Sequence, residues 1–237
     1  MLTDLTAVLL MLQAAVSDLP APSEPPAQYE AAPAAESAAM VEALANKTLI
    51  RTGPKFKQEP NFIRPEAARI AGEFGEVVLS GIIGEDGRLT EVSLRVSSKS
   101  DIIDAAALAA VPEMLFEPAR DATGKPLSVF TNVEIEYSHV DFRGERSVLN
   151  YTCEQFVLDY DWWNSKWPAD KRDRFYATMR GFATVAALHG NKVFKSNDFG
   201  TRWNVAIDDC RKTPTQLMLN VLTPYGAFIR EMVSRKI

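Results

Sequence analysis

The sequence predicts an α+β fold, in which a small antiparallel sheet packed on two helices is followed by a disulfide-clamped all-α bundle. Two β-type segments, 77–83 and 89–97, flank Asp86-Gly87, which is a strong hairpin signal. A further strand is expected at 129–137, with Val129, Thr131, Val133, Ile135 and Tyr137 on one face and Phe130, Asn132, Glu134 and Glu136 on the other. From Tyr151 onward these strand signals stop and helical patterns follow. The change in pattern indicates two domains, at 61–138 and 151–237.

The first predicted domain begins with a short helix at 65–71, which Gly72 ends. In the strand at 89–97, Val92, Leu94 and Val96 alternate with polar residues, so we expect these three side chains to be buried.

A second helix is expected to start at Ser100-Asp101. Its apolar residues recur at helical spacing, at Ile103, Ala107, Ala110 and Met114. Because a proline disrupts a helix interior, Pro112 should end this helix near Val111. The order of helix, hairpin, helix and strand predicts a sheet with helices on one side.

The second predicted domain contains helices only. We expect them at 154–161, 171–189, 201–212, 214–222 and 224–235. Thr213-Pro214 predicts a helix start, with Thr213 as the capping residue, and Thr223-Pro224 repeats the pattern. The polar stretch 139–150 is interpreted as a linker between the two domains.

The N-terminal 17 residues are interpreted as a signal peptide or a short anchor. Ala7–Val16 has the length of a signal-peptide apolar region, although the first basic residue is Lys47; a short buried helix is the alternative reading. Residues 18–60 follow as a Pro/Ala-rich linker. Its last part, 47–60, is either irregular or a packed arm of the next domain.

The two cysteines, Cys153 and Cys210, belong to no CxxC or Cys/His cluster. In an exported protein such an even pair forms a disulfide, whereas in a cytosolic protein both would be buried thiols. Export is the preferred hypothesis. It implies a periplasmic or cell-envelope location, with membrane association only through the N-terminal segment if that segment is not cleaved.

The sequence contains no motif typical of an enzyme. His139 and His189 have no spaced partner for a metal ion, and no nucleotide-binding loop or nucleophile motif occurs. The net charge of -5 argues against a nucleic-acid partner. We therefore expect no enzymatic activity, cofactor or metal. Trp162-Trp163 and Trp167 either line a peptide or sugar surface or fill a core.

Residues 61–137 resemble the TonB C-terminal domain family. The matching features follow one another with the family's spacing: Pro65-Glu66-Ala67-Ala68, Gly75-Glu76-Val77-Val78-Leu79, Gly87-Arg88-Leu89, Ser97-Ser98, Asp104–Val111, Phe116-Glu117-Pro118-Ala119 and Gly124-Lys125-Pro126. One departure is Arg64, where the family usually has a tyrosine. The resemblance implies a binding module of the cell envelope that engages a short segment of an outer-membrane receptor and is linked to transport.

The predicted partner-binding strand is the last one of the sheet. An open sheet edge pairs with an extended peptide through main-chain hydrogen bonds. The residues expected to bind a protein or peptide are Val129, Thr131, Val133, Ile135 and Tyr137. The alternative is an edge blocked by the preceding arm or by the helical domain. The same unpaired edge would also allow a homodimer.

Residues 151–237 resemble the HdeA-type small helical periplasmic proteins. The shared features are Tyr151–Phe156 with its cysteine, Gly181-Phe182-Ala183, and Cys210–Pro214. This resemblance implies a helical pair clamped by a Cys153–Cys210 disulfide. It also gives the alternative function, a periplasmic stress chaperone acting through the helical domain.

Overall fold

The computed structural model describes residues 37–58, 60–141, 147–168, 170–188 and 198–234. From residue 37 onward the chain forms one compact unit. The predicted signal peptide or anchor, residues 18–36 and 59 of the predicted Pro/Ala-rich linker, and His189 lie outside the described residues. No described helix is long and apolar enough to cross a membrane.

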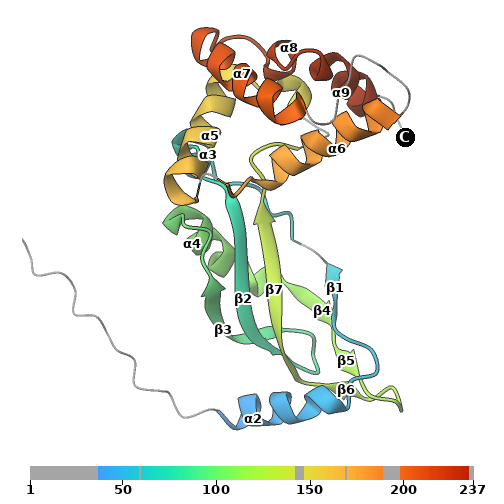
Figure 1. Ribbon diagram of the computed structural model, residues 1–237. Coiled ribbons are helices and arrows are strands. Elements are labelled where there is room, and N and C mark those ends of the chain that lie inside the picture. Colours follow the sequence, from blue (N-terminus) through green and yellow to red (C-terminus); the bar gives the residue numbers. More distant parts are fainter. Residues whose placement is uncertain (1–36, 59, 142–146, 169, 189–197, 235–237) are drawn as a thin grey trace, which may run out of the picture. The chain divides into compact units, whose positions relative to one another are not determined.

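A three-stranded antiparallel sheet has β2 (Gly75–Ile83) in its centre, between β3 (Leu89–Val96) and β7 (Val129–Tyr137) (Figure 1). Every residue of β2 has a register partner in β7, from Gly75 opposite Tyr137 to Ile83 opposite Val129. The predicted hairpin joins β2 to β3, with Gly87 at a φ of 78°. A Cβ at this position would lie 2.0 Å from the carbonyl oxygen of Phe116, so the turn requires glycine for two reasons.

The predicted buried face of β3 is wrong for two of its three residues. Leu94 and Val96 are 40% and 46% exposed, and Val92 is half-buried. The register between β2 and β3 shifts at two places, and Glu91 has a φ of 48°. Since each irregularity changes the side of the sheet that the next side chain faces, the simple alternation of the sequence does not produce one buried face.

The helices α3 (Glu66–Ala71) and α4 (Asp101–Ala109) form where the sequence predicts them. Ser100 caps α4, because its Oγ accepts a hydrogen bond from the main-chain N–H of Ile103. Ile103 and Ala107 are buried against the sheet.

The end of α4 is also as predicted. Pro112 lies in a 3₁₀ turn, η2 (Val111–Glu113), and the α-helix ends before it.

The segment before the sheet is a packed arm, one of the two alternatives for 47–60. It contains α2 (Ala38–Ala45), the 3₁₀ turn η1 (Asn46–Thr48) and β1 (Lys55–Gln58). β1 pairs with β4 (Leu115–Glu117) in a separate two-stranded sheet. A second short ladder joins β5 (Ala119–Arg120) to β6 (Pro126–Leu127).

The C-terminal part is helical, as predicted. After the 3₁₀ turn η3 (Val148–Asn150) it contains α5 (Cys153–Lys166), α6 (Arg174–Leu188), α7 (Phe199–Lys212), α8 (Met218–Val221) and α9 (Tyr225–Ser234). Cys153 and Cys210 form a disulfide with an S–S distance of 2.03 Å, which confirms the predicted pairing. It joins the first residue of α5 to the last turn of α7, and both cysteines are fully buried.

One predicted helix start in this part is wrong. Thr213 ends α7 instead of capping a new helix, because its Oγ1 donates a hydrogen bond to the carbonyl oxygen of Asp209. The carbonyl oxygen of Pro214 accepts a hydrogen bond from the N–H of Glu154 at the start of α5, and α8 begins only at Met218. These main-chain contacts between segments override the local Thr-Pro signal.

Two residues of the stretch predicted as a linker, 139–150, are core residues. Val140 and Val148 are buried in the same hydrophobic cluster as Phe156, Trp203 and Tyr225 of the helices. The chain therefore enters the helical core before Tyr151. We refer below to 61–138 as the sheet segment and to 151–237 as the helical segment.

Candidate partner-binding surface

The predicted partner-binding strand, β7, lies at an edge of the sheet. Among the described residues its main chain pairs with β2 alone. In an antiparallel ladder every second residue directs its N–H and C=O away from the neighbouring strand. β7 therefore presents a row of main-chain donors and acceptors on the side opposite β2.

The five nominated residues of β7 do not offer their side chains to a partner. Val129, Val133, Ile135 and Tyr137 are buried in the core, and Thr131 is half-buried. Contact through this strand must therefore use its main chain.

The exposed side chains of β7 belong to the opposite face. Asn132 and Glu134 are exposed there. Sequence alternation alone places these two residues on that face, but does not reveal which face is covered.

The arm contacts β7 through α2 and η1, whereas its β1 stretch lies across a hollow from the strand. Among the described residues no main-chain hydrogen bond joins the arm to β7. The hollow has a volume of about 210 Å³ and is lined by residues 131–134 of β7 and by Pro54, Lys55 and Phe56 of the arm. Nearer the start of β7, Asn46 donates a hydrogen bond to the carbonyl oxygen of Ser128 at 3.0 Å.

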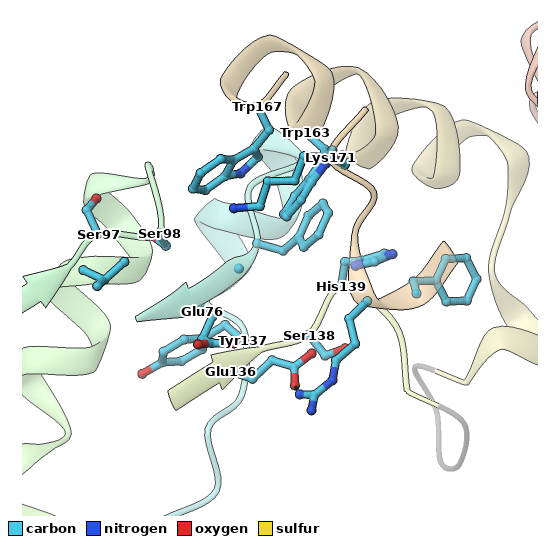
Figure 2. Close-up of a pocket in the computed structure, with 15 residues that line it drawn as sticks. Glu76, Ser97, Ser98, Glu136, Tyr137, Ser138, His139, Trp163, Trp167 and Lys171 are labelled. Atoms are coloured by element: carbon cyan, nitrogen blue, oxygen red, sulfur yellow. Dashed lines mark hydrogen bonds and ion pairs between the residues drawn. The ribbon is translucent and has the colours of Figure 1, made fainter. Parts of the chain in front are cut away.

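A second hollow lies where β2 begins and β7 ends (Figure 2). We call it the aromatic pocket, and its volume is about 230 Å³. Aromatic and strand-end residues make most of its wall: Phe74, Val96, Ser97, Ser98, Tyr137, His139, Trp163, Trp167 and Phe175. Trp163 stacks on Phe74 with ring centroids 5.3 Å apart, and Trp167 lies 5.5 Å from Trp163.

The three tryptophans considered from the sequence thus have different environments. Trp162 is buried, with 9% of its surface exposed, and packs 5.4 Å from Phe74. Trp163 and Trp167 line the aromatic pocket. The core interpretation is confirmed for Trp162, whereas a peptide or sugar surface at Trp163 and Trp167 stays a prediction.

Charged groups surround the mouth of the aromatic pocket. The ammonium of Lys171 lies 3.4 Å from the ring centroid of Trp167. Glu136 pairs with Arg174, and Glu76 stands directly opposite Glu136 in the ladder. Like charges opposite each other destabilise a strand pair, and Arg174 offsets one of them.

His139 forms part of the pocket wall as a neutral ring. It packs 4.0 Å from Phe74 and 5.0 Å from Phe175. Burial, with the nearby Arg64 charge, lowers the pKa of His139 to about 3. Among the described residues no cluster of His, Cys, Asp or Glu could hold a metal ion. His139 is a partly buried ring packed among aromatic side chains.

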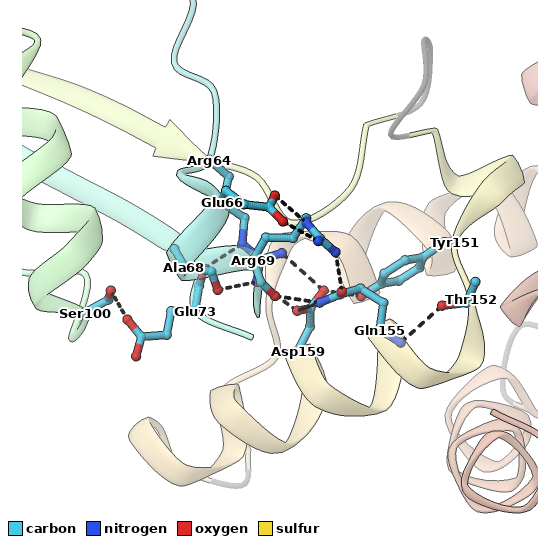
Figure 3. Close-up of polar contacts among 10 residues, drawn as sticks. All are labelled: Arg64, Glu66, Ala68, Arg69, Glu73, Ser100, Tyr151, Thr152, Gln155 and Asp159. Carbon is cyan, nitrogen blue, oxygen red and sulfur yellow. Dashed lines mark hydrogen bonds and ion pairs between the residues drawn. The ribbon is translucent and has the colours of Figure 1, made fainter. Parts of the chain in front are cut away.

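Arg64, the departure from the family pattern, forms a buried polar network with α5 (Figure 3). Its guanidinium lies 2.9 Å from the carboxylate of Asp159, and both side chains are 2% exposed. It also donates to the carbonyl oxygens of Glu73 at 2.7 Å and Ala68 at 3.2 Å. Arg64 thereby ties α3 and the strand entry to the helical segment.

Asp159 has further donors around it. The hydroxyl of Tyr151 donates to it at 2.6 Å and the side-chain amide of Gln155 at 2.8 Å. Burial raises the pKa of Asp159, and the guanidinium of Arg64 opposes that rise. The pKa of Tyr151 is raised well above its ordinary value, mainly by burial. The sequence did not predict this network, because its members are far apart along the chain.

The described residues form an α+β fold with an edge strand, β7, joined to a disulfide-linked helical segment. Residues 60–139, about a third of the chain, match the family described as Gram-negative bacterial TonB protein C-terminal. Domains of that family interact with proteins such as outer-membrane receptors, belong to envelope proteins and are not enzymes. A comparison with curated proteins finds no match.

Proposed function

We propose that this chain is a non-enzymatic periplasmic or cell-envelope protein that binds an extended peptide of a protein partner by strand addition to β7. The partner is a short segment of an outer-membrane receptor, which links the chain to transport. The observation that carries the proposal is the edge position of β7, whose main chain pairs with β2 alone among the described residues.

The regularity of β7 supports this edge over the other edge of the sheet. β7 is regular over nine residues, without a register shift, whereas the ladder between β2 and β3 contains two shifts. Irregular edge strands pair poorly with added strands, because their donors and acceptors are unevenly spaced. The charge of Glu134 keeps the edge soluble in the absence of a partner.

The alternative, a stress chaperone, would need apolar surface for unfolded clients. The large apolar residues of the helical segment that are exposed, Leu158, Val185 and Val205, are between 36% and 46% exposed. Its other large apolar side chains include a buried cluster around the disulfide. The described helical surface therefore gives the chaperone function no specific support.

Site-directed disulfide cross-linking tests the proposal. The natural cysteines are bonded to each other, so an added cysteine is the single free thiol. Glu134→Cys places it on β7 and Arg95→Cys, also exposed, places it on β3. The probes are peptides that carry the N-terminal periplasmic segments of the outer-membrane receptors encoded in the same genome, with cysteine moved through each position.

We expect Glu134→Cys to cross-link at one or two adjacent peptide positions, because directly opposed Cβ atoms of paired strands are about 4.5–5.5 Å apart. Arg95→Cys should give only the background seen with a scrambled peptide. Cross-linking at β3 alone, or at neither edge with any receptor segment, would contradict the proposal.

A further inference from the structure

We propose that the aromatic pocket is a side-chain subsite of the same partner site, which takes one large apolar or aromatic side chain of the peptide that adds to β7. This inference rests on the proposed function and adds a specificity determinant to it. The relevant part of the pocket comes from outside the family match, since Trp163, Trp167 and Phe175 belong to the helical segment.

The pocket adjoins the last residues of β7, where the start of β2 and the end of β3 also lie. Its wall contains Glu136, Tyr137 and Ser138, which are the last two residues of β7 and the residue after it. A neighbouring hollow of about 310 Å³ shares Glu136 and Ser138 with it and extends to Val140 and Thr178. A peptide paired along β7 therefore arrives at these hollows when it passes Tyr137.

The chemistry of the wall favours an apolar side chain. Trp163 and Trp167 provide half-buried ring surface, the buried Phe175 and Tyr137 complete the lining, and Val96 adds an aliphatic group that is 46% exposed. Aromatic rings pack with one another in offset or edge-to-face arrangements at centroid distances of 4.5–7 Å. A volume of about 230 Å³ accommodates a single ring. The ligand class is therefore a Phe, Tyr, Trp, Leu or Met side chain.

Two polar features select how that side chain is presented. Trp167 has a buried ring N–H with no acceptor among the described residues, so a partner that brings a carbonyl oxygen to it would remove the cost of leaving this donor unpaired. The ammonium of Lys171 lies 3.4 Å from the ring centroid of Trp167 (Figure 2), and that of Lys99 lies 5.4 Å from it, so positive charge stands beside a side chain that packs there.

Coupling between peptide and protein variants tests the subsite. The probe is a receptor-segment peptide that cross-links to Glu134→Cys. The same peptide is also cross-linked to Asn132→Cys, and comparison of the two cross-linked peptide positions gives its direction along β7. The peptide residue that lies beyond Tyr137 is then set to Phe or Ala. Affinities are measured by fluorescence anisotropy with the wild-type chain, Trp167→Ala, and Leu94→Ala as an exposed apolar control on β3.

We expect the wild-type chain to bind the Phe peptide about 10- to 100-fold more tightly than the Ala peptide, as burial of one large apolar side chain implies. Trp167→Ala should remove most of that preference, while Leu94→Ala should keep it. Thermal unfolding shows whether each variant is folded. If Trp167→Ala is not folded, Val96→Asp replaces it. The exposed position of Val96 tolerates a charge, and a Phe side chain in the pocket would desolvate the new carboxylate at a cost.

The two hypotheses fail differently. If peptides cross-link to β7 but the Phe preference is absent, or is the same in the pocket variant and in wild type, the subsite is overturned and strand addition stands. If no receptor peptide cross-links to β7, the proposed function itself fails.

Discussion

Replacing Arg64 by methionine should destabilise the chain more than any exposed charge replacement. The substitution keeps most of the side-chain volume but removes the guanidinium from Asp159, 2.9 Å away, with both side chains 2% exposed. Removing one partner of a buried ion pair costs about 3–5 kcal/mol. Because Tyr151 and Gln155 still donate to Asp159, we expect the low end of this range, about 3 kcal/mol.

The loss should depend on pH in a defined direction. The charge of Arg64 holds down the pKa of Asp159, which burial raises. Without Arg64 that pKa rises further, so the folded state takes up a proton more readily than the unfolded state. A group with a raised folded-state pKa contributes stability at low pH that is lost as the pH increases. The destabilisation by Arg64→Met should therefore be largest at pH 7 and smaller near pH 4.

Urea unfolding with the disulfide intact, followed by circular dichroism at pH 7 and pH 4, measures this effect. Arg211→Met is the matched control. Arg211 pairs with Asp161, which lies on α5 as Asp159 does, but the side chains of Arg211 and Asp161 are 44% and 49% exposed. An exposed pair contributes about 1 kcal/mol or less. The reasoning is refuted if Arg64→Met loses no more stability than Arg211→Met, or if its loss is equal at both pH values.

Four further substitutions have defined outcomes. Replacing Cys153 and Cys210 by serine should lower the free energy of unfolding by about 4 kcal/mol, since the bond closes a loop with a sequence separation of 57, and chemical denaturation of oxidised and mutant protein checks this. Gly87→Ala should lower the melting temperature by several degrees, because its Cβ would overlap a main-chain oxygen 2.0 Å away; a melting temperature equal to wild type would contradict it. Asp173→Asn should raise the free energy of unfolding at pH 7 and leave it unchanged near pH 3. The reason is that burial raises the pKa of Asp173 from 3.8 to about 6 and so penalises only the charged form. Equal gains at both pH values would exclude this cause. His139→Phe should reduce the loss of stability on acidification from pH 6.5 to pH 3. In this interval the unfolded chain binds a proton at His139, whereas the buried ring, with its pKa lowered to about 3, does not. Unfolding curves measured across this interval check the prediction.

The elements with strong local signals could be predicted from the sequence. Three local features depend only on residues close to them in the sequence: the Asp86-Gly87 turn, the helix start at Ser100 and the helix end before Pro112. β7 was predicted with its observed bounds, because its length and alternation are regular. The disulfide was predicted from the export hypothesis and the resemblance to HdeA-type proteins, and two cysteines allow a single intramolecular pairing.

The errors arise where distant contacts decide. Leu94 and Val96 alternate like buried residues, yet irregular pairing with β2 leaves them exposed. Thr213-Pro214 looks like a helix start, but the main chain there hydrogen-bonds to α5 and α7 instead. Periodicity and capping signals use only neighbouring residues, so they predict neither the exposure of Leu94 and Val96 nor the loss of the helix start at Thr213.

The candidate site shows the same division. The binding strand was predicted from 129–137, but the aromatic pocket was not, because its wall joins strand ends near residues 75, 97 and 137 to the loop after α5. Composition offered one usable signal. Two tryptophans, at positions 163 and 167, occur in a polar stretch that contains lysines, where a core is not expected. These two tryptophans line the aromatic pocket.

Arg64 connects the family pattern to what is particular to this chain. The position before Pro65 is usually a tyrosine in the family, and here it carries a buried charge whose counterion, Asp159, lies in the helical segment. An isolated sheet segment would lose that counterion, and it would expose Phe74, which is 4% exposed in the whole chain and packs on Trp162 and Trp163. The sheet segment is therefore built to fold with the helical segment attached. If the aromatic pocket takes a partner side chain, the same attachment makes the helical segment part of the recognition surface, so removal of 151–237 should reduce both stability and peptide selectivity.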